Sequence, residues 1–352
     1  MAGLAKCHAA TWKTAQMKGC VLRLSMEAPS LRANPLGDAS TRELLVYVPP
    51  DYEASDGLFP AAYFLHGYAG CALQWLNVSA FTPNVVERID ALMSSGELPG
   101  CLCIFIDGWT SLGGSQWLNT EAQGNYFDYV TKDVVHFVEE NFRACREPGK
   151  RALLGKSSGG YAAWTAACHC PEVFGHVAAH SADACFEYCY LGDLPKAAAP
   201  LRQAGGVVAW FEEFKRRAFA TKMKGEDFAV VNILAMSASY SPSLGMPLNV
   251  ALPMDLETGA MKEEVWQRWL AKDPTRFVPA QTQLLKKLKS LFFDCGTKDE
   301  FHLIWGARQL SQLLKAQNVA HHFEEFNDGH MGINYRFENS LRYLLPRMQL
   351  PI

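Results

Sequence analysis

The stretch Leu153-Leu154-Gly155-Lys156-Ser157-Ser158-Gly159-Gly160-Tyr161 contains the pattern Gly-x-Ser-x-Gly directly behind an apolar run. This pattern is typical of a sharp strand-to-helix turn that holds a serine in a strained conformation at the end of a strand. The residues two positions before and after that serine must be small, because larger side chains would collide in the turn. Gly155 and Gly159 meet this requirement, so the sequence predicts a nucleophilic Ser157.

A phosphate-binding loop is the alternative for this segment, since Gly155-Lys156-Ser157 resembles the end of the motif G-x-x-x-x-G-K-[ST]. That motif needs a glycine at position 150, where the chain has Lys150. The apolar residues before Gly155 also run straight into it and leave no loop that could wrap around a phosphate. The sequence therefore favours the nucleophile turn over a nucleotide site.

Short apolar strands alternate with helical patterns on both sides of this turn. Apolar residues recur at helical spacing between Tyr126 and Phe142. Strands are expected at residues 20–26, 43–48, 61–65, 101–106, 151–154, 176–179, 290–294 and 321–326. This order predicts an α/β fold with a mostly parallel central sheet and helices on both faces. Active sites in such sheets form beyond the carboxyl ends of the strands, where Ser157 would lie.

Residues 185–284 interrupt the alternation of strands and helices. Helical segments at 208–223 and 263–270 flank a stretch rich in proline and glycine, and the whole is far longer than one crossover helix requires. We expect a core made of residues 1–184 and 285–352, with residues 185–284 inserted as a helical cap. An independent domain is the alternative, although neither end of the insertion has a linker-like composition.

Charge and hydropathy narrow the classes of partner. The 352 residues carry 33 Lys and Arg against 36 Asp and Glu, a net charge of −3 without a long run of one sign. This balance argues against nucleic acid and anionic membranes as partners. No segment approaches the roughly 20 apolar residues that span a bilayer, and the N-terminus lacks an apolar segment of signal-peptide length. We expect a cytoplasmic protein without a membrane span, and the sequence leaves its oligomeric state open.

The eleven cysteines do not form the dense framework of a small disulfide-stabilised domain. The segment Cys168-His169-Cys170 has no second ligand pair at zinc-site spacing. We therefore expect reduced thiols and no metal site.

A neutral serine hydroxyl is a poor nucleophile, so Ser157 needs a base and an acid that orients the base. After a turn of this type they follow in the order acid, then histidine. Asp299 lies in the loop after the strand 290–294, and His330 follows the last strand in a glycine-flanked turn. Asp294 and Glu300 are the alternative acids, but Asp294 belongs to the strand and Glu300 should point away from Asp299. The expected catalytic residues are Ser157, Asp299 and His330.

The oxyanion of an acyl-transfer reaction needs two backbone N–H donors. Ser158, which follows the nucleophile, supplies one, and Tyr68 in the loop His66-Gly67-Tyr68-Ala69-Gly70 is the best candidate for the second.

Several of these segments, taken together, resemble the putative-esterase family of α/β-hydrolases. They are Tyr47-Val48-Pro49-Pro50-Asp51-Tyr52, Phe64-Leu65-His66-Gly67, Gly155 to Gly160, Asp294-Cys295-Gly296-Thr297-Lys298-Asp299 and Asp328-Gly329-His330. The family is similar to S-formylglutathione hydrolase (esterase D), feruloyl and acetylxylan esterases, enterochelin esterase and the mycolyltransferases. The resemblance covers residues 20–184 and 285–345. The chain departs from it at Ser158, where many relatives carry methionine, and in the long cap.

The resemblance implies that the loop 107–120 lies near the site, which makes Trp109, Gln116 and Trp117 candidate substrate-binding residues. The alternative is that the two tryptophans pack the cap onto the core. The expected function is a carboxylesterase-type serine hydrolase acting on a small to medium or aryl ester, with no cofactor. An acyltransferase of the mycolyltransferase type, a thioester hydrolase and a catalytically silent hydrolase-fold binding protein are the alternatives.

Overall fold

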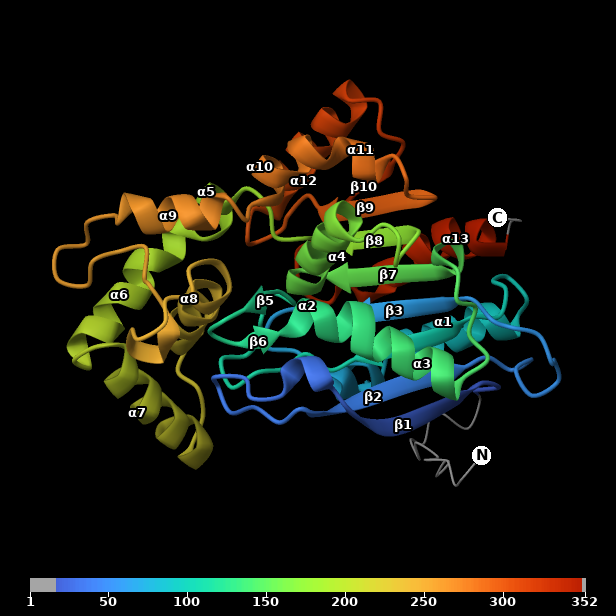
Figure 1. Cartoon of the computed structure of the whole chain (residues 1–352), viewed down its shortest axis with the longest axis horizontal. Coiled ribbons are helices and arrows are strands. Elements are labelled where there is room, and N and C mark those ends of the chain that lie inside the picture. Colours follow the sequence, from blue (N-terminus) through green and yellow to red (C-terminus); the bar gives the residue numbers. More distant parts are fainter. Residues whose placement is uncertain (1–16, 350–352) are drawn as a thin grey trace.

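The computed structural model describes residues 17–349, and an eight-stranded sheet lies at its centre (Figure 1). The strand order is β1-β2-β4-β3-β7-β8-β9-β10. From β4 to β10 all neighbours are parallel, whereas β2 pairs antiparallel with both β1 and β4. The strands are β1 (Cys20–Glu27), β2 (Thr41–Val48), β3 (Ala61–Leu65), β4 (Leu102–Ile106), β7 (Arg151–Lys156), β8 (His176–His180), β9 (Ser290–Gly296) and β10 (His322–Phe326). The predicted α/β-hydrolase fold is confirmed.

Helices cover both faces of this sheet, and each layer buries a separate apolar cluster. The helices α1 (Val85–Ser94) and α13 (Arg336–Gln349) pack on one face. The other face carries α2 (Tyr126–Asp128), the π-helix η4 (Tyr129–Val134), α3 (Val135–Asn141), α4 (Ser158–His169) and α12 (Leu303–Ala316). Both faces are apolar because the central strands carry continuous apolar runs, and every residue of β3 and β4 is buried.

Short elements complete the core. A two-stranded sheet is formed by β5 (Asn119–Thr120) and β6 (Gly124–Asn125). The 3₁₀ turns are η2 (Pro29–Leu31), η3 (Ala72–Leu76), η5 (Pro148–Lys150) and η9 (Ile333–Tyr335). None of the helices formed by residues 17–349 is long and apolar enough to cross a membrane.

The region between β8 and β9 is helical and has an apolar cluster of its own. Its elements are α5 (Phe186–Cys189), η6 (Leu191–Asp193), α6 (Leu194–Gln203), α7 (Val207–Ala220), α8 (Asp227–Tyr240), η7 (Pro247–Asn249), α9 (Glu263–Leu270), α10 (Pro274–Phe277), η8 (Val278–Gln281) and α11 (Thr282–Leu285). Helices α6 to α9 form a separate layer beyond the carboxyl ends of the strands (Figure 1). Trp210, Leu234 and Trp269 lie in its buried cluster, which also includes Tyr161 of α4.

One carboxylate joins the two ends of this region. Asp273 is fully buried and accepts hydrogen bonds from the backbone N–H groups of Cys185 at 3.0 Å and Phe186 at 2.6 Å. Beyond Asp273 the chain returns to the core, since Val278 and Leu285 pack in the cluster formed by α4 and α12. The layer of α6 to α9 is therefore closed at its base by side-chain to backbone hydrogen bonds.

Candidate active site

Ser157 lies between the end of β7 and the start of α4, in a strained conformation. Its backbone angles are φ 57° and ψ −122°, which a residue with a side chain rarely adopts. A Cβ added to Gly155 would overlap the backbone of Gly159, and a Cβ added to Gly159 would overlap the carbonyl of Leu65. Glycine is thus required on both sides of the serine, because β7, α4 and β3 meet there without room for a methyl group.

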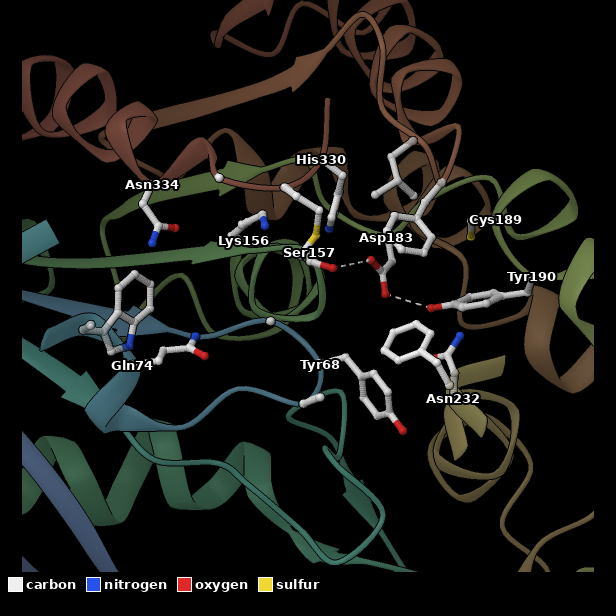
Figure 2. A pocket seen from close by; sticks show the side chains of 18 of the residues that line it. Tyr68, Gln74, Lys156, Ser157, Asp183, Cys189, Tyr190, Asn232, His330 and Asn334 are labelled. Carbon is white, nitrogen blue, oxygen red and sulfur yellow. Dashed lines mark hydrogen bonds between the residues drawn. The ribbon is translucent and has the colours of Figure 1, made fainter. Parts of the chain in front are cut away.

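His330 and Asp299 form a buried pair at the same edge of the sheet. The imidazole Nδ1 of His330 lies 2.9 Å from Oδ2 of Asp299, and the two residues are 4% and 5% exposed. The ring of Phe301 packs edge-on against the imidazole, with ring centres 4.8 Å apart. With Nδ1 directed at the carboxylate, Nε2 is the nitrogen available to accept a proton. Figure 2 shows the His330 side chain pointing toward Ser157.

The two alternative acids have other partners. Asp294 lies within β9, where its carboxylate contacts His180 Nδ1 at 2.8 Å and accepts from Arg336 Nε at 2.8 Å. The carboxylate of Glu300 accepts from the backbone N–H of His330 at 2.6 Å. Glu300 therefore holds the loop that carries the histidine, a role that no sequence motif indicates.

A cavity of about 440 Å³ opens over Ser157 (Figure 2). Ser157 and His330 line it near its middle. One side, formed with the inserted helices, carries Tyr68, Asp183, Cys189, Tyr190 and Asn232, and the other carries Gln74, Lys156 and Asn334. Phe228 and Trp75 also line the cavity. Burial lowers the pKa of the Lys156 ammonium, and the nearby carboxylates of Asp299 and Glu300 raise it. The cavity thus offers polar groups on both sides of the serine.

The loop after β3 brings its backbone close to the serine. A Cβ added to Gly67 would lie 3.3 Å from the Cβ of Ser157, so the backbone before Tyr68 passes directly over this serine. Ser158 is the first residue of α4, and its N–H therefore has no acceptor within the helix. The side chain of Tyr68 lines the cavity and donates from its hydroxyl to the carbonyl of Leu112 at 2.8 Å.

The structure brings a further carboxyl group to the serine. Asp183 follows β8, and its Oδ1 lies 3.4 Å from Ser157 Oγ. Its Oδ2 accepts from Gln116 Nε2 and from the Tyr190 hydroxyl, both at 2.8 Å. Burial raises the pKa of the Asp183 carboxyl above its ordinary value, and these two hydrogen bonds act in the opposite direction. No sequence motif marks this residue.

The residues expected to bind substrate do not line the cavity. Trp109 is 46% exposed and is absent from the cavity wall. Trp117 is buried against the ring of His66, with ring centres 4.9 Å apart, and donates from Nε1 to the His66 carbonyl. Gln116 is fully buried behind Asp183. Gln116 and Trp117 both adopt positive φ angles, and both side chains lie in the protein interior. Substrate binding by these three residues stays a prediction.

The fold and the strained serine at the carboxyl edge of the sheet define the chain as an α/β-hydrolase. It belongs to the family described as "Putative esterase", whose profile matches residues 39–347. The predicted family is therefore confirmed, and the expected class of carboxylesterase-type hydrolase agrees with it.

Solved structures share this fold across nearly the whole chain. A ferulic acid esterase superposes with a TM-score of 0.60 at 15% identity, covering 94% of this chain and 99% of the other. An S-formylglutathione hydrolase from Agrobacterium tumefaciens gives a TM-score of 0.57 at 16% identity, covering 94% and 96%. At such identities the likeness concerns the fold.

A curated relative matches a shorter part of the chain. It is the uncharacterized protein YbbA of Bacillus subtilis (strain 168), which is 25% identical over 160 residues. The aligned part is 42% of this chain and 60% of that relative's own length.

Proposed function

We propose that the protein is a serine carboxylic ester hydrolase whose catalytic residues are Ser157, His330 and Asp299. The observation that carries the proposal is the buried 2.9 Å contact between Asp299 and His330, since His330 lines the cavity that also exposes the strained Ser157. Family membership supports ester hydrolysis as the reaction class.

In the proposed reaction, Ser157 Oγ attacks the ester carbonyl carbon while His330 Nε2 takes the hydroxyl proton. Asp299 stabilises the imidazolium that forms, and the N–H groups of Tyr68 and Ser158 bind the oxyanion. The imidazolium then gives its proton to the leaving alcohol, which leaves an acyl-enzyme. Water attacks this ester, with His330 again acting as the base, and releases the carboxylic acid and the free serine.

Residues 185–284 act in this proposal as a cap that shapes the substrate cavity. The cavity wall includes Cys189 and Tyr190 at the end of α5, and Phe228 and Asn232 of α8. Substrate specificity would therefore depend on this insertion as well as on the core. An ester of small to medium size, or an aryl ester, suits a cavity of about 440 Å³ lined partly by aromatic rings.

The test is hydrolysis of short-chain p-nitrophenyl esters by wild-type protein and by Ser157→Ala. We expect kcat to fall by at least about a thousandfold, because the covalent step is lost. A fluorophosphonate probe should label wild-type protein at Ser157 and should not label the variant. Ser95→Ala, which removes an exposed serine at the end of α1, is the matched control. Hydrolysis by Ser157→Ala at the wild-type rate would exclude the proposed function.

A further inference from the structure

Asp183 supplies a carboxylate oxygen inside the cavity that the proposed reaction does not use. Oδ1 of Asp183 lies 3.4 Å from Ser157 Oγ, which is the hydrogen bond that Figure 2 draws from the serine. This separation exceeds the usual range of about 2.5 to 3.0 Å for a bond between two oxygen atoms. The contact is therefore weak, and a better donor brought by the substrate would replace it.

The orientation of this carboxylate is fixed by groups behind it. Gln116 Nε2 and the Tyr190 hydroxyl both donate to Oδ2, and both side chains are buried. Gln116 also donates to the hydroxyl of Tyr240 at 2.6 Å, which extends the network into α8. Since Oδ2 is occupied twice, Oδ1 is the oxygen left to accept a hydrogen bond from a bound molecule.

The position of Oδ1 indicates which part of a substrate it can reach. A carbonyl carbon under attack by Ser157 lies about 3 to 3.5 Å from Oγ before the bond forms. A group two to four bonds from that carbon can then come within hydrogen-bonding distance of Oδ1. The carboxylate therefore faces a substituent close to the scissile ester bond, on either its acyl or its alcohol side.

Two groups in the cavity that carry or gain a positive charge favour a neutral donor over a cationic one. The Lys156 ammonium lines the same cavity, and His330 gains a positive charge in the proposed reaction. A cationic substituent would be repelled by both groups, whereas a hydroxyl would not. Asn232 lies on the same side as Asp183 and offers an amide that can bond to a hydroxyl oxygen.

We infer that Asp183 is a specificity-determining residue that accepts a hydrogen bond from a hydroxyl group beside the scissile ester, so that the preferred substrates are hydroxylated esters. The inference rests on the proposed function. Binding of the substrate hydroxyl also removes Asp183 as an acceptor for Ser157, whose hydroxyl is then free to turn to His330. Recognition of the hydroxyl and release of the nucleophile are thereby coupled.

The experiment compares kcat/KM within matched sets of esters at pH 8. On the acyl side these are ethyl lactate, ethyl 2-methoxypropionate, ethyl propionate and the ethyl ester of alanine. On the alcohol side they are 2-hydroxyethyl propionate and propyl propionate. Wild-type protein should prefer the hydroxylated ester of at least one set by about 10- to 100-fold, the usual effect of a hydrogen bond to a charged group. The methoxy ester can accept but not donate, so it should not share this advantage.

The variant Asp183→Asn keeps the shape of the side chain and reverses its hydrogen bonding. Its amide oxygen would take the place of Oδ2, because Gln116 and Tyr190 both donate there, and its NH₂ group would face Ser157. We expect the preference for hydroxyl over methoxy to fall to less than about threefold. Tyr190→Phe is the matched variant, since it removes one donor to Oδ2 and leaves Oδ1 in place; it should keep a preference for the hydroxylated ester.

The outcomes separate this inference from the proposed function. A wild-type ratio near one for both sets overturns the inference, however the variant behaves. An unchanged preference in Asp183→Asn, or a faster reaction with the alanine ester than with ethyl lactate, also overturns it. In each of these cases the proposed function stands as long as Ser157→Ala has lost hydrolysis of the unsubstituted esters.

Discussion

Nδ1 of His330 lies 2.9 Å from Oδ2 of Asp299, and a second histidine–carboxylate pair, His180 Nδ1 with Asp294 Oδ1 at 2.8 Å, lies fully buried in the adjacent strands. The two pairs differ in their second ring nitrogen. His180 Nε2 contacts the hydroxyl of Ser340 at 2.9 Å, whereas the His330 side chain points toward Ser157. Of these two histidines, only His330 thus has a ring nitrogen that could act as a base on Ser157.

The first prediction concerns Asp299→Asn. The amide cannot stabilise the imidazolium and can favour the wrong tautomer of His330, so kcat for ester hydrolysis should fall by about 10³- to 10⁴-fold. Asp294→Asn is the matched control: it should lower the free energy of unfolding by about 3 kcal/mol, because it removes the buried carboxylate that pairs with Arg336 and leaves that guanidinium with the partly exposed Glu324. Steady-state kinetics measure kcat, and urea unfolding measures the free energy of unfolding, for both variants. If Asp294→Asn caused the larger loss of kcat, Asp294 would be the acid.

The second prediction concerns Glu300, whose carboxylate holds the backbone N–H of His330 at 2.6 Å. Glu300→Ala should lower kcat by about tenfold, because a charge-assisted hydrogen bond that orients the histidine loop is lost. Glu300→Gln retains an oxygen acceptor at this position and should recover most of the activity. A merely structural role predicts instead that both variants change the melting temperature while kcat of the folded protein stays constant.

The third prediction concerns Gly159, where a Cβ would overlap the carbonyl of Leu65. Gly159→Ala forces α4 away from β3, and overpacking of this kind costs about 1 to 3 kcal/mol or more. Thermal unfolding should therefore show a lower melting temperature, together with a lower kcat because the loop after β3 moves. Gly192→Ala is the control, since a Cβ at Gly192 meets nothing within 4 Å. Equal melting temperatures for the two variants would contradict the close approach.

Much of the sheet could be predicted from the sequence because its strands are buried on both faces. The run Ala61–Leu65 matches β3 residue for residue, because a short apolar run between turn residues is stable as a strand that is buried on both faces of a sheet. The Gly-x-Ser-x-Gly turn could also be predicted, because only small residues fit on both sides of the serine. The antiparallel pairing of β2 with its neighbours was not specified by any local pattern.

The inserted helices were harder to predict for two physical reasons. Helix α8 is buried on nearly all sides, so Asp227–Tyr240 has no polar stripe that would mark a helical period. Helix α6 contains Pro195 in its first turn and Pro200 in its interior, and proline in a sequence usually indicates an end. Both helices are stabilised by packing in the shared apolar cluster more than by local preference.

The candidate site could be predicted from the sequence only for residues whose order along the chain is characteristic of the fold. The order of Ser157, Asp299 and His330 follows from the topology of such sheets, which places three loops at one edge. Asp183 had a weaker signal, since it follows a strand that neighbours β7 in the sheet, but the sequence does not state which strands are neighbours. The inward turn at Gln116 and Trp117 depends on positive φ angles that neither residue type indicates.

The last prediction concerns stability at acid pH and His176, which is fully buried with Nδ1 2.5 Å from the Ser290 hydroxyl and Nε2 3.0 Å from the Gly149 carbonyl. Burial lowers its pKa from 6.5 to about 4. In the unfolded chain this histidine therefore binds a proton below about pH 6.5, whereas in the folded chain it binds one only below about pH 4. The free energy of unfolding falls as the pH is lowered through this window. The wild-type protein should lose about 2 kcal/mol more than His176→Asn between pH 7.5 and pH 5, as measured by denaturant unfolding. His136→Asn, which removes an exposed histidine, controls for the loss of a histidine as such. Parallel pH profiles for wild type and His176→Asn would mean that His176 takes up its proton in the folded protein as readily as in the unfolded chain.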